Sequence, residues 1–175
     1  MNGFYAPDAT GDQQAGVMRE DELETFLRER IPLSNAMDVR VQSISAGRVV
    51  LSAPIAPNLN HRDTAFGGSA SALAILAAWS AVRVRMQDEG LEGRIVIRRN
   101  TMSYDQPMAA DFSATASAPD ASEWEKLRAA LGRGRPGRVR VKAILECLGE
   151  RAGELTGEFV VLPCVDAPVR SSPIP

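Results

Sequence analysis

The fold of this chain is decided by the stretch Asn58-Leu59-Asn60-His61-Arg62-Asp63-Thr64-Ala65-Phe66-Gly67-Gly68-Ser69 and by the apolar run 70–84 that follows it. Polar, turn-prone residues fill its front half, and the run beyond the glycine pair has almost no polar face until Arg83. This pattern predicts a long buried helix. Because glycine has no Cβ, another molecule can approach the first backbone N–H groups, where the helix dipole adds partial positive charge. We therefore expect a carbonyl oxygen or an anion to bind there.

Local sequence leaves simpler interpretations of these residues open. A Gly-Gly pair before a helix is often only a tight entry turn. Asp63 could cap the helix, and His61, the single histidine of the chain, could serve only to hold its own loop.

Composition favours one ordinary globular domain. The chain has 175 residues, of which 45% are hydrophobic and 24% charged, with a net charge of -2, so we expect a soluble protein with no overall attraction to nucleic acid. Cys147 and Cys164 match neither a metal-binding spacing nor a disulfide framework, which favours the reducing cytoplasm. The N-terminus lacks a signal-peptide pattern, and the run 70–84 is too short and alanine-rich for a membrane span.

The pattern around the central run predicts an α+β chain with a flexible arm over 1–18, a single domain over 19–163 and a flexible tail over 164–175. Strands do not alternate regularly with helices, so a doubly wound sheet is not expected. One antiparallel sheet can cover only part of so apolar a helix, which points to self-association as a homodimer or homotetramer. The predicted helices cover 19–31, about 69–87 and 119–131, and the predicted strands cover 39–44, 49–55, 94–104, 112–118, 138–147 and 155–161.

This order of elements carries a resemblance to a known family. Asn60 and His61 lead into Phe66-Gly67-Gly68-Ser69 and an alanine-rich helix, and Tyr104-Asp105-Gln106-Pro107-Met108 follows the next strand. Over roughly 31–162 the chain resembles the hotdog-fold thioesterases, most closely the thioesterase domain at the C-terminal end of certain bacterial two-domain acetyltransferase proteins. The resemblance implies an antiparallel sheet wrapped around the central helix, paired sheets in a dimer, and an acyl thioester between protomers with its pantetheine arm at the helix N-terminus.

Thioester hydrolysis needs donors for the oxyanion and a group that activates water. The N–H groups of Gly67 and Gly68 suit the first task. Asp63 or His61 could deprotonate water, and Asn60 or Thr64 could hold water or the carbonyl. By their places in the resembling motifs, Phe66, Ser69 and Tyr104 are expected to contact the substrate. No metal and no cofactor are expected beyond the coenzyme A or phosphopantetheine of the substrate itself.

The chain departs from the family at the catalytic acid. Many hotdog thioesterases carry an acidic residue about two turns into the central helix, whereas this helix offers only Ala, Leu, Ile, Trp and Ser there. The identity of the base therefore stays open between Asp63 and His61, with Asp105 as the next candidate.

A basic cluster lies near the end of the chain. Arg133, Arg135 and Arg138, followed by Arg140 and Lys142, could be a solvated loop and strand face. They could instead bind the phosphates of coenzyme A or the acidic surface of an acyl carrier protein.

The leading hypothesis is an acyl-thioesterase of fatty acid metabolism that hydrolyses a coenzyme A or carrier-protein thioester by direct attack of water. A hotdog hydratase or dehydratase using His61 and Asp63 is a second hypothesis. A non-catalytic acyl-binding or regulatory module is a third, which the missing helix acid favours.

Overall fold

A computed structural model describes residues 18–45 and 47–164. The predicted arm over 1–18 and tail over 164–175 therefore lie outside the described residues, apart from Met18 and Cys164. Met18 is buried against the core, and Cys164 is exposed.

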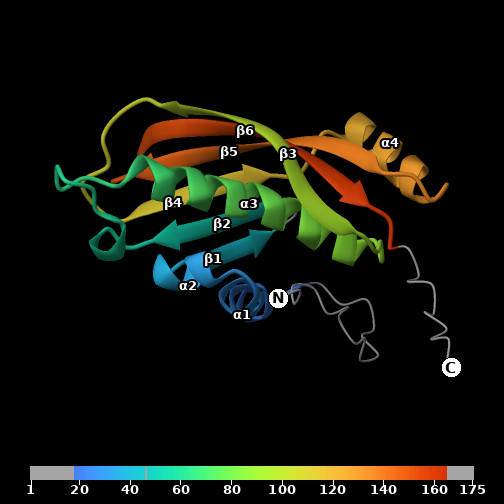
Figure 1. Cartoon of the computed structure of the whole chain (residues 1–175), viewed down its shortest axis with the longest axis horizontal. Coiled ribbons are helices and arrows are strands. Elements are labelled where there is room, and N and C mark those ends of the chain that lie inside the picture. Colours follow the sequence, from blue (N-terminus) through green and yellow to red (C-terminus); the bar gives the residue numbers. More distant parts are fainter. Residues whose placement is uncertain (1–17, 46, 165–175) are drawn as a thin grey trace, which may run out of the picture.

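A six-stranded antiparallel sheet wraps around one long helix, α3 (Gly67–Asp88) (Figure 1). The sheet has the order β1-β2-β4-β5-β6-β3, so β1 and β3 are its two edges. This arrangement confirms the predicted α+β hotdog layout. The strands are β1 (Arg40–Ser45), β2 (Arg48–Ala53), β3 (Arg94–Tyr104), β4 (Phe112–Ser117), β5 (Gly137–Cys147) and β6 (Glu150–Leu162).

Small side chains let α3 lie close to the sheet. Ala74 and Ala77 on α3 are fully buried, and so are Ala114 and Ala116 on the inner face of β4. Short side chains on both sides reduce the separation between the backbones, and larger residues such as Phe159 fill the space beside them. By length and composition α3 could cross a membrane, but buried core helices meet the same criterion, and 56% of its most apolar window lies inside this fold.

Four short helices complete the described part of the chain: α1 (Glu20–Arg30), α2 (Pro32–Ala36), the 3-10 turn η1 (Ala56–Asn58) and α4 (Ala121–Leu131). Pro32 ends the first helix, as predicted, but it also begins α2, because proline is tolerated in the first turn of a helix. Asp120 caps α4 by accepting from the N–H groups of Ser122 and Glu123. The predicted strands 138–147 and 155–161 leave residues 148–154 between them, but the turn is only the two residues Leu148-Gly149, both with positive φ, and the chain returns at once as β6.

The two sheet edges are treated differently. At β1, the carboxylates of α1 accept from the strand: Glu24 from Val41 N–H at 2.9 Å and Glu20 from Ile44 N–H at 3.1 Å. Helix α1 therefore covers that edge. No described strand pairs with the outer side of β3, where Val96 and Ile97 are each 37% exposed. An open edge of this length is suited to pairing with another strand.

The close contact between β3 and β6 gives a test of the fold. A Cβ added at Gly153 of β6 would lie 2.5 Å from the backbone oxygen of Ser103 on β3, which cannot move independently of its strand. We predict that Gly153→Ala lowers the free energy of unfolding by about 1 to 3 kcal/mol, because the strands must separate. Urea denaturation measures this as a lower midpoint with an unchanged slope.

Gly132→Ala is the matched control. Gly132 has φ -61, and its added Cβ would meet nothing closer than 3.5 Å, so this variant should unfold at or slightly above the wild-type midpoint. Equal midpoints for Gly153→Ala and Gly132→Ala would contradict the described register of β3 and β6.

Candidate active site

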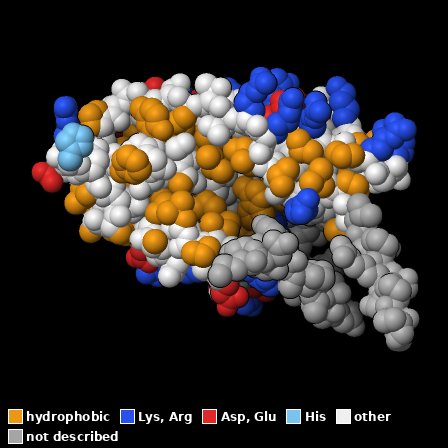
Figure 2. Space-filling model, in the orientation of Figure 1, with side chains coloured by type: hydrophobic (Ala, Val, Ile, Leu, Met, Phe, Trp, Pro, Cys, Tyr) orange, Lys and Arg blue, Asp and Glu red, His pale blue; other side chains and the backbone are white. Residues whose placement is uncertain are grey.

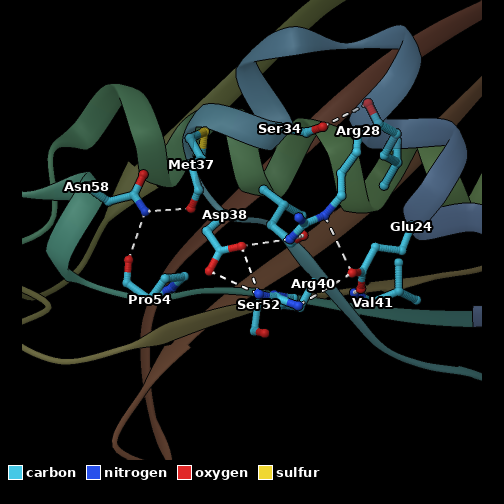
Figure 3. Close-up of polar contacts among 12 residues, drawn as sticks. Glu24, Arg28, Ser34, Met37, Asp38, Arg40, Val41, Ser52, Pro54 and Asn58 are labelled. Carbon is cyan, nitrogen blue, oxygen red and sulfur yellow. Dashed lines mark hydrogen bonds and ion pairs between the residues drawn. The ribbon is translucent and has the colours of Figure 1, made fainter. Parts of the chain in front are cut away.

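The loop that leads into α3 is anchored by a buried asparagine. Asn58 donates through Nδ2 to the backbone oxygens of Met37 at 3.0 Å and Pro54 at 2.8 Å (Figure 3). Its own backbone oxygen accepts from Phe66 N–H at 2.7 Å, where the chain returns. The loop 59–65 is thereby closed at its base.

Asn60 organises the interior of this loop. Its Oδ1 accepts from Arg62 N–H at 2.7 Å, and its Nδ2 donates to Thr64 Oγ1 at 2.9 Å and to the backbone oxygen of Ala65 at 3.2 Å. The backbone N–H of Asn60 also donates to Thr64 at 2.8 Å. The structure thus gives Asn60 and Thr64, predicted to hold water or the carbonyl, a clear part in fixing the loop.

Helix α3 begins without a side-chain cap. Its N-cap residue is Phe66, whose backbone oxygen accepts from Ala70 N–H at 3.0 Å but whose side chain cannot accept a hydrogen bond. Helix caps are usually Ser, Thr, Asp or Asn. Within the described residues, the N–H groups of Gly67, Gly68 and Ser69 have no acceptor. The interpretation of Asp63 as the helix cap is therefore wrong, and three donors remain at the positive end of the dipole.

A hollow of about 370 Å³ lies beside this helix start. Its wall consists of Ala65, Gly67, Tyr104, Asp105, Gln106, Pro107 and Met108. Tyr104 joins its two sides, because its hydroxyl donates to the backbone oxygen of Gly67 at 3.0 Å. The structure therefore brings together the two motifs on which the family resemblance rests, one before α3 and one after β3.

His61 and Asp63 lie outside this hollow. Both side chains are exposed, and neither belongs to the hollow's wall. His61 Nε2 accepts from Arg62 Nε at 3.4 Å, and Asp63 has φ 58, in the left-handed region. Phe66 is 56% exposed, and its ring covers Gly68 so closely that an added Cβ there would be 2.2 Å from the ring.

Asp105 is the acidic residue that the structure places in the wall of the hollow. Its Oδ2 accepts from Arg151 Nε at 3.1 Å, and Gln106 Nε2 donates to the backbone oxygen of Arg151 at 2.6 Å. Sequence reasoning missed Arg151 altogether. No local motif marks it, and only the pairing of Tyr104 with Gly153 brings β6 beside the end of β3.

The basic cluster lies at the opposite end of α3 within the protomer. Arg138 pairs with Val160, which in turn faces Val96 near the start of β3, whereas Gly67 lies against Tyr104 at the other end of that strand. Figure 2 shows Lys and Arg side chains gathered at the end of the molecule where α4 lies. Arg140 pairs with Glu123, and Lys142 with Glu154 at 3.2 Å. Among the described residues, Arg133, Arg135 and Arg138 form no ion pair.

Comparison with known proteins identifies the family of this chain. A family model described as "Putative thioesterase (yiiD_Cterm)" matches residues 20–163. The chain belongs to this thioesterase family. The domain predicted from sequence over 19–163 has nearly the same extent as the match.

Solved structures share the fold of this family member. The crystal structure of a putative thioesterase from Shewanella oneidensis has 28% sequence identity and a TM-score of 0.75, covering 82% of this chain and 97% of that one. A protein of unknown function from Chlorobaculum tepidum has 25% identity and a TM-score of 0.77, covering 85% and 99%. A thioesterase from Haemophilus influenzae, with 12% identity and a TM-score of 0.70 over 88% and 97%, shares the fold alone. Family and neighbours together indicate a thioester hydrolase.

Proposed function

We propose that this family member is an acyl-thioesterase that hydrolyses a coenzyme A or acyl-carrier-protein thioester by direct attack of water. The observation that carries the proposal is the uncapped start of α3. Three N–H donors, those of Gly67, Gly68 and Ser69, have no acceptor among the described residues, and Gly67 borders a hollow next to them. A thioester carbonyl would accept from these donors, and they would stabilise the oxyanion that forms when water adds.

The side chains around the donors suit an acyl thioester. Tyr104, Pro107 and Met108 give the hollow an apolar wall, and Phe66 lies beside it over Gly68. We propose that Phe66, Ser69 and Tyr104 contact the substrate. No cofactor is required beyond the coenzyme A or phosphopantetheine of the substrate.

Substitution of Gly68 tests the role of the helix start. A side chain at this position must compete with the Phe66 ring for the same space, so Gly68→Val should obstruct the approach of the carbonyl. Loss of one oxyanion donor lowers kcat by about 100-fold or more, and we predict a decrease of that size. Release of free thiol from a panel of acyl-coenzyme A esters measures it.

Gly132→Ala, which adds a carbon at the end of α4 and outside the wall of the hollow, should keep wild-type kcat in the same assay. A folded Gly68→Val variant with wild-type kcat would show that the carbonyl does not bind at these N–H groups.

We further propose that two protomers pair through β3. The β1 edge is covered by the carboxylates of α1, whereas β3 is open and exposes Val96 and Ile97. Figure 2 shows apolar side chains spread across the face on which α3 lies in Figure 1, next to β3. Antiparallel pairing of β3 with its copy would extend the sheet and cover this face.

Charge on the open edge should prevent this pairing. We predict that the wild-type chain sediments as a dimer or tetramer at micromolar concentration and that the double variant Val96→Lys/Ile97→Lys sediments as a monomer. Leu148→Lys is the control, because Leu148 is 81% exposed but lies in the β5–β6 turn, at the opposite end of β6 from Val160, the partner of Val96. A monodisperse wild-type monomer would exclude the proposed assembly.

Pairing through β3 would also give the basic cluster a function. In an antiparallel pair the start of one β3 lies beside the end of the other, so the cluster of the second protomer would approach the Tyr104 end of the first. We propose that Arg133, Arg135 and Arg138 there bind the phosphates of the substrate, for which the forked guanidinium is well suited.

We predict that the triple variant Arg133→Gln/Arg135→Gln/Arg138→Gln raises KM while kcat stays near the wild-type value, and that its KM depends less on ionic strength. The corresponding triple Arg→Lys variant keeps the charge and should keep a KM closer to wild type. Identical KM and salt dependence in all three proteins would assign the cluster to an ordinary solvated surface.

One observation favours a second function. The only acidic residue of α3 is Asp88 at its last position, so the helix carries no carboxylate near the glycine pair. A non-catalytic acyl-binding module would have the same helix start without a base. Binding of acyl-coenzyme A in calorimetry without any release of thiol would identify such a module.

A further inference from the structure

We propose that Asp105 is the general base of this hydrolysis and that Arg151 is its positioning residue. The inference rests on the proposed thioesterase function. It assigns the catalytic carboxylate to the end of β3 rather than to the central helix or to the loop before it.

Asp105 is the only carboxylate in the wall of the hollow that contains Gly67. A base must lie within hydrogen-bond reach of the water that attacks the carbonyl, so it must share a cavity with the oxyanion donors. Asp63 and His61 do not line this hollow, and α3 has no carboxylate before Asp88. Among the described acidic residues, only Asp105 shares the hollow with Gly67, one of the proposed donors.

The segment that carries Asp105 is fixed on both sides. The N–H groups of Asp105 and Gln106 donate to the backbone oxygen of Ala152 on β6, at 2.9 and 3.3 Å. On the other side, the backbone oxygen of Met108 accepts from Ala65 N–H at 2.7 Å. The neighbouring Tyr104 hydroxyl bonds to the first residue of α3. These contacts hold the carboxylate at a constant place relative to the helix start, which is what a catalytic base requires.

Arg151 orients the carboxylate but leaves part of it free. It binds Oδ2 of Asp105, whereas Oδ1 has no hydrogen-bond partner among the described residues. The Asp105 side chain is 44% exposed, so water can reach it. The charged group facing Asp105 is Arg151, which also binds Glu154 on β6 at 3.1 Å, and Glu154 in turn pairs with Lys142.

The chemistry is a balanced hydrolysis. The thioester oxygen accepts from the N–H groups at the start of α3. A water oxygen adds to the carbonyl carbon while Asp105 Oδ1 takes one proton from that water. The tetrahedral oxyanion then collapses, the C–S bond breaks, and the thiolate leaves with the proton returned by Asp105. The products are a carboxylic acid and a thiol, and no other reactant is needed.

The test compares three near-isosteric substitutions in the full chain: Asp105→Asn, Asp63→Asn and His61→Gln. We expect Asp105→Asn to lower kcat by about 100-fold or more with little change in KM, because positioned bases typically contribute that much. Asp63→Asn and His61→Gln should keep kcat within about twofold of wild type. Urea midpoints check that all three variants are folded, and Asp105→Ala provides a second variant at the same position.

Arg151 is tested by the kinetic parameters of two variants. Arg151→Gln should lower kcat with little change in KM, because Asp105 loses the group that orients its carboxylate, and Arg151→Lys, which keeps a cationic donor, should restore kcat in part. A wild-type chain that releases no thiol from any ester overturns the proposed function itself. An active wild-type chain whose Asp105→Asn and Asp105→Ala variants keep kcat overturns the assignment of the base alone.

Discussion

The contact between α3 and the inner face of the sheet is the constraint on which the rest of the structure depends. Alanines on the helix meet alanines on β4 and β5, and this lets the sheet curve closely around a helix of 22 residues. Along such a helix the backbone groups are hydrogen-bonded to one another, and only the two terminal turns leave them free. Its first turn is one of them, and there an apolar N-cap leaves N–H groups open. Packing and chemistry are therefore linked, because the same burial that holds α3 directs its positive end toward the hollow.

The same packing leaves the sheet with unequal edges. Helix α1 offers Glu20 and Glu24 to the N–H groups of β1, so that edge is already satisfied by hydrogen bonds from within the chain. At the other edge, β3 presents apolar and basic side chains without a partner strand among the described residues. Because the β1 edge is covered, a strand of another protomer can join this sheet only beside β3 among the described strands. In the proposed dimer, pairing through β3 would also bring the basic cluster of one protomer toward the hollow of the other.

The candidate site combines residues of different origin. Gly67 and Gly68 belong to the loop-helix motif, Tyr104 and Asp105 to the end of β3, and Arg151 to β6. The family is one of thioesterases, yet α3 lacks the usual helix carboxylate. A carboxylate that approaches the same hollow from a strand end would supply the missing base without altering the close packing of the helix.

The sequence by itself determined the elements and their class. The long apolar run 70–84 predicts α3, alternation over 138–147 predicts β5, and the run 119–131 predicts α4, because each signal depends on neighbours along the chain. The glycine pair likewise marks the helix start from sequence alone. Only the tertiary structure decided that Asp63 does not cap α3, that Asp105 meets Arg151 and that the arginine cluster lies at the far end of the helix. The first depends on how Asn58 and Asn60 close the loop before α3, and the other two depend on strand register. Residues 46 positions apart become neighbours only once β3 has paired with β6, and no local pattern encodes that pairing.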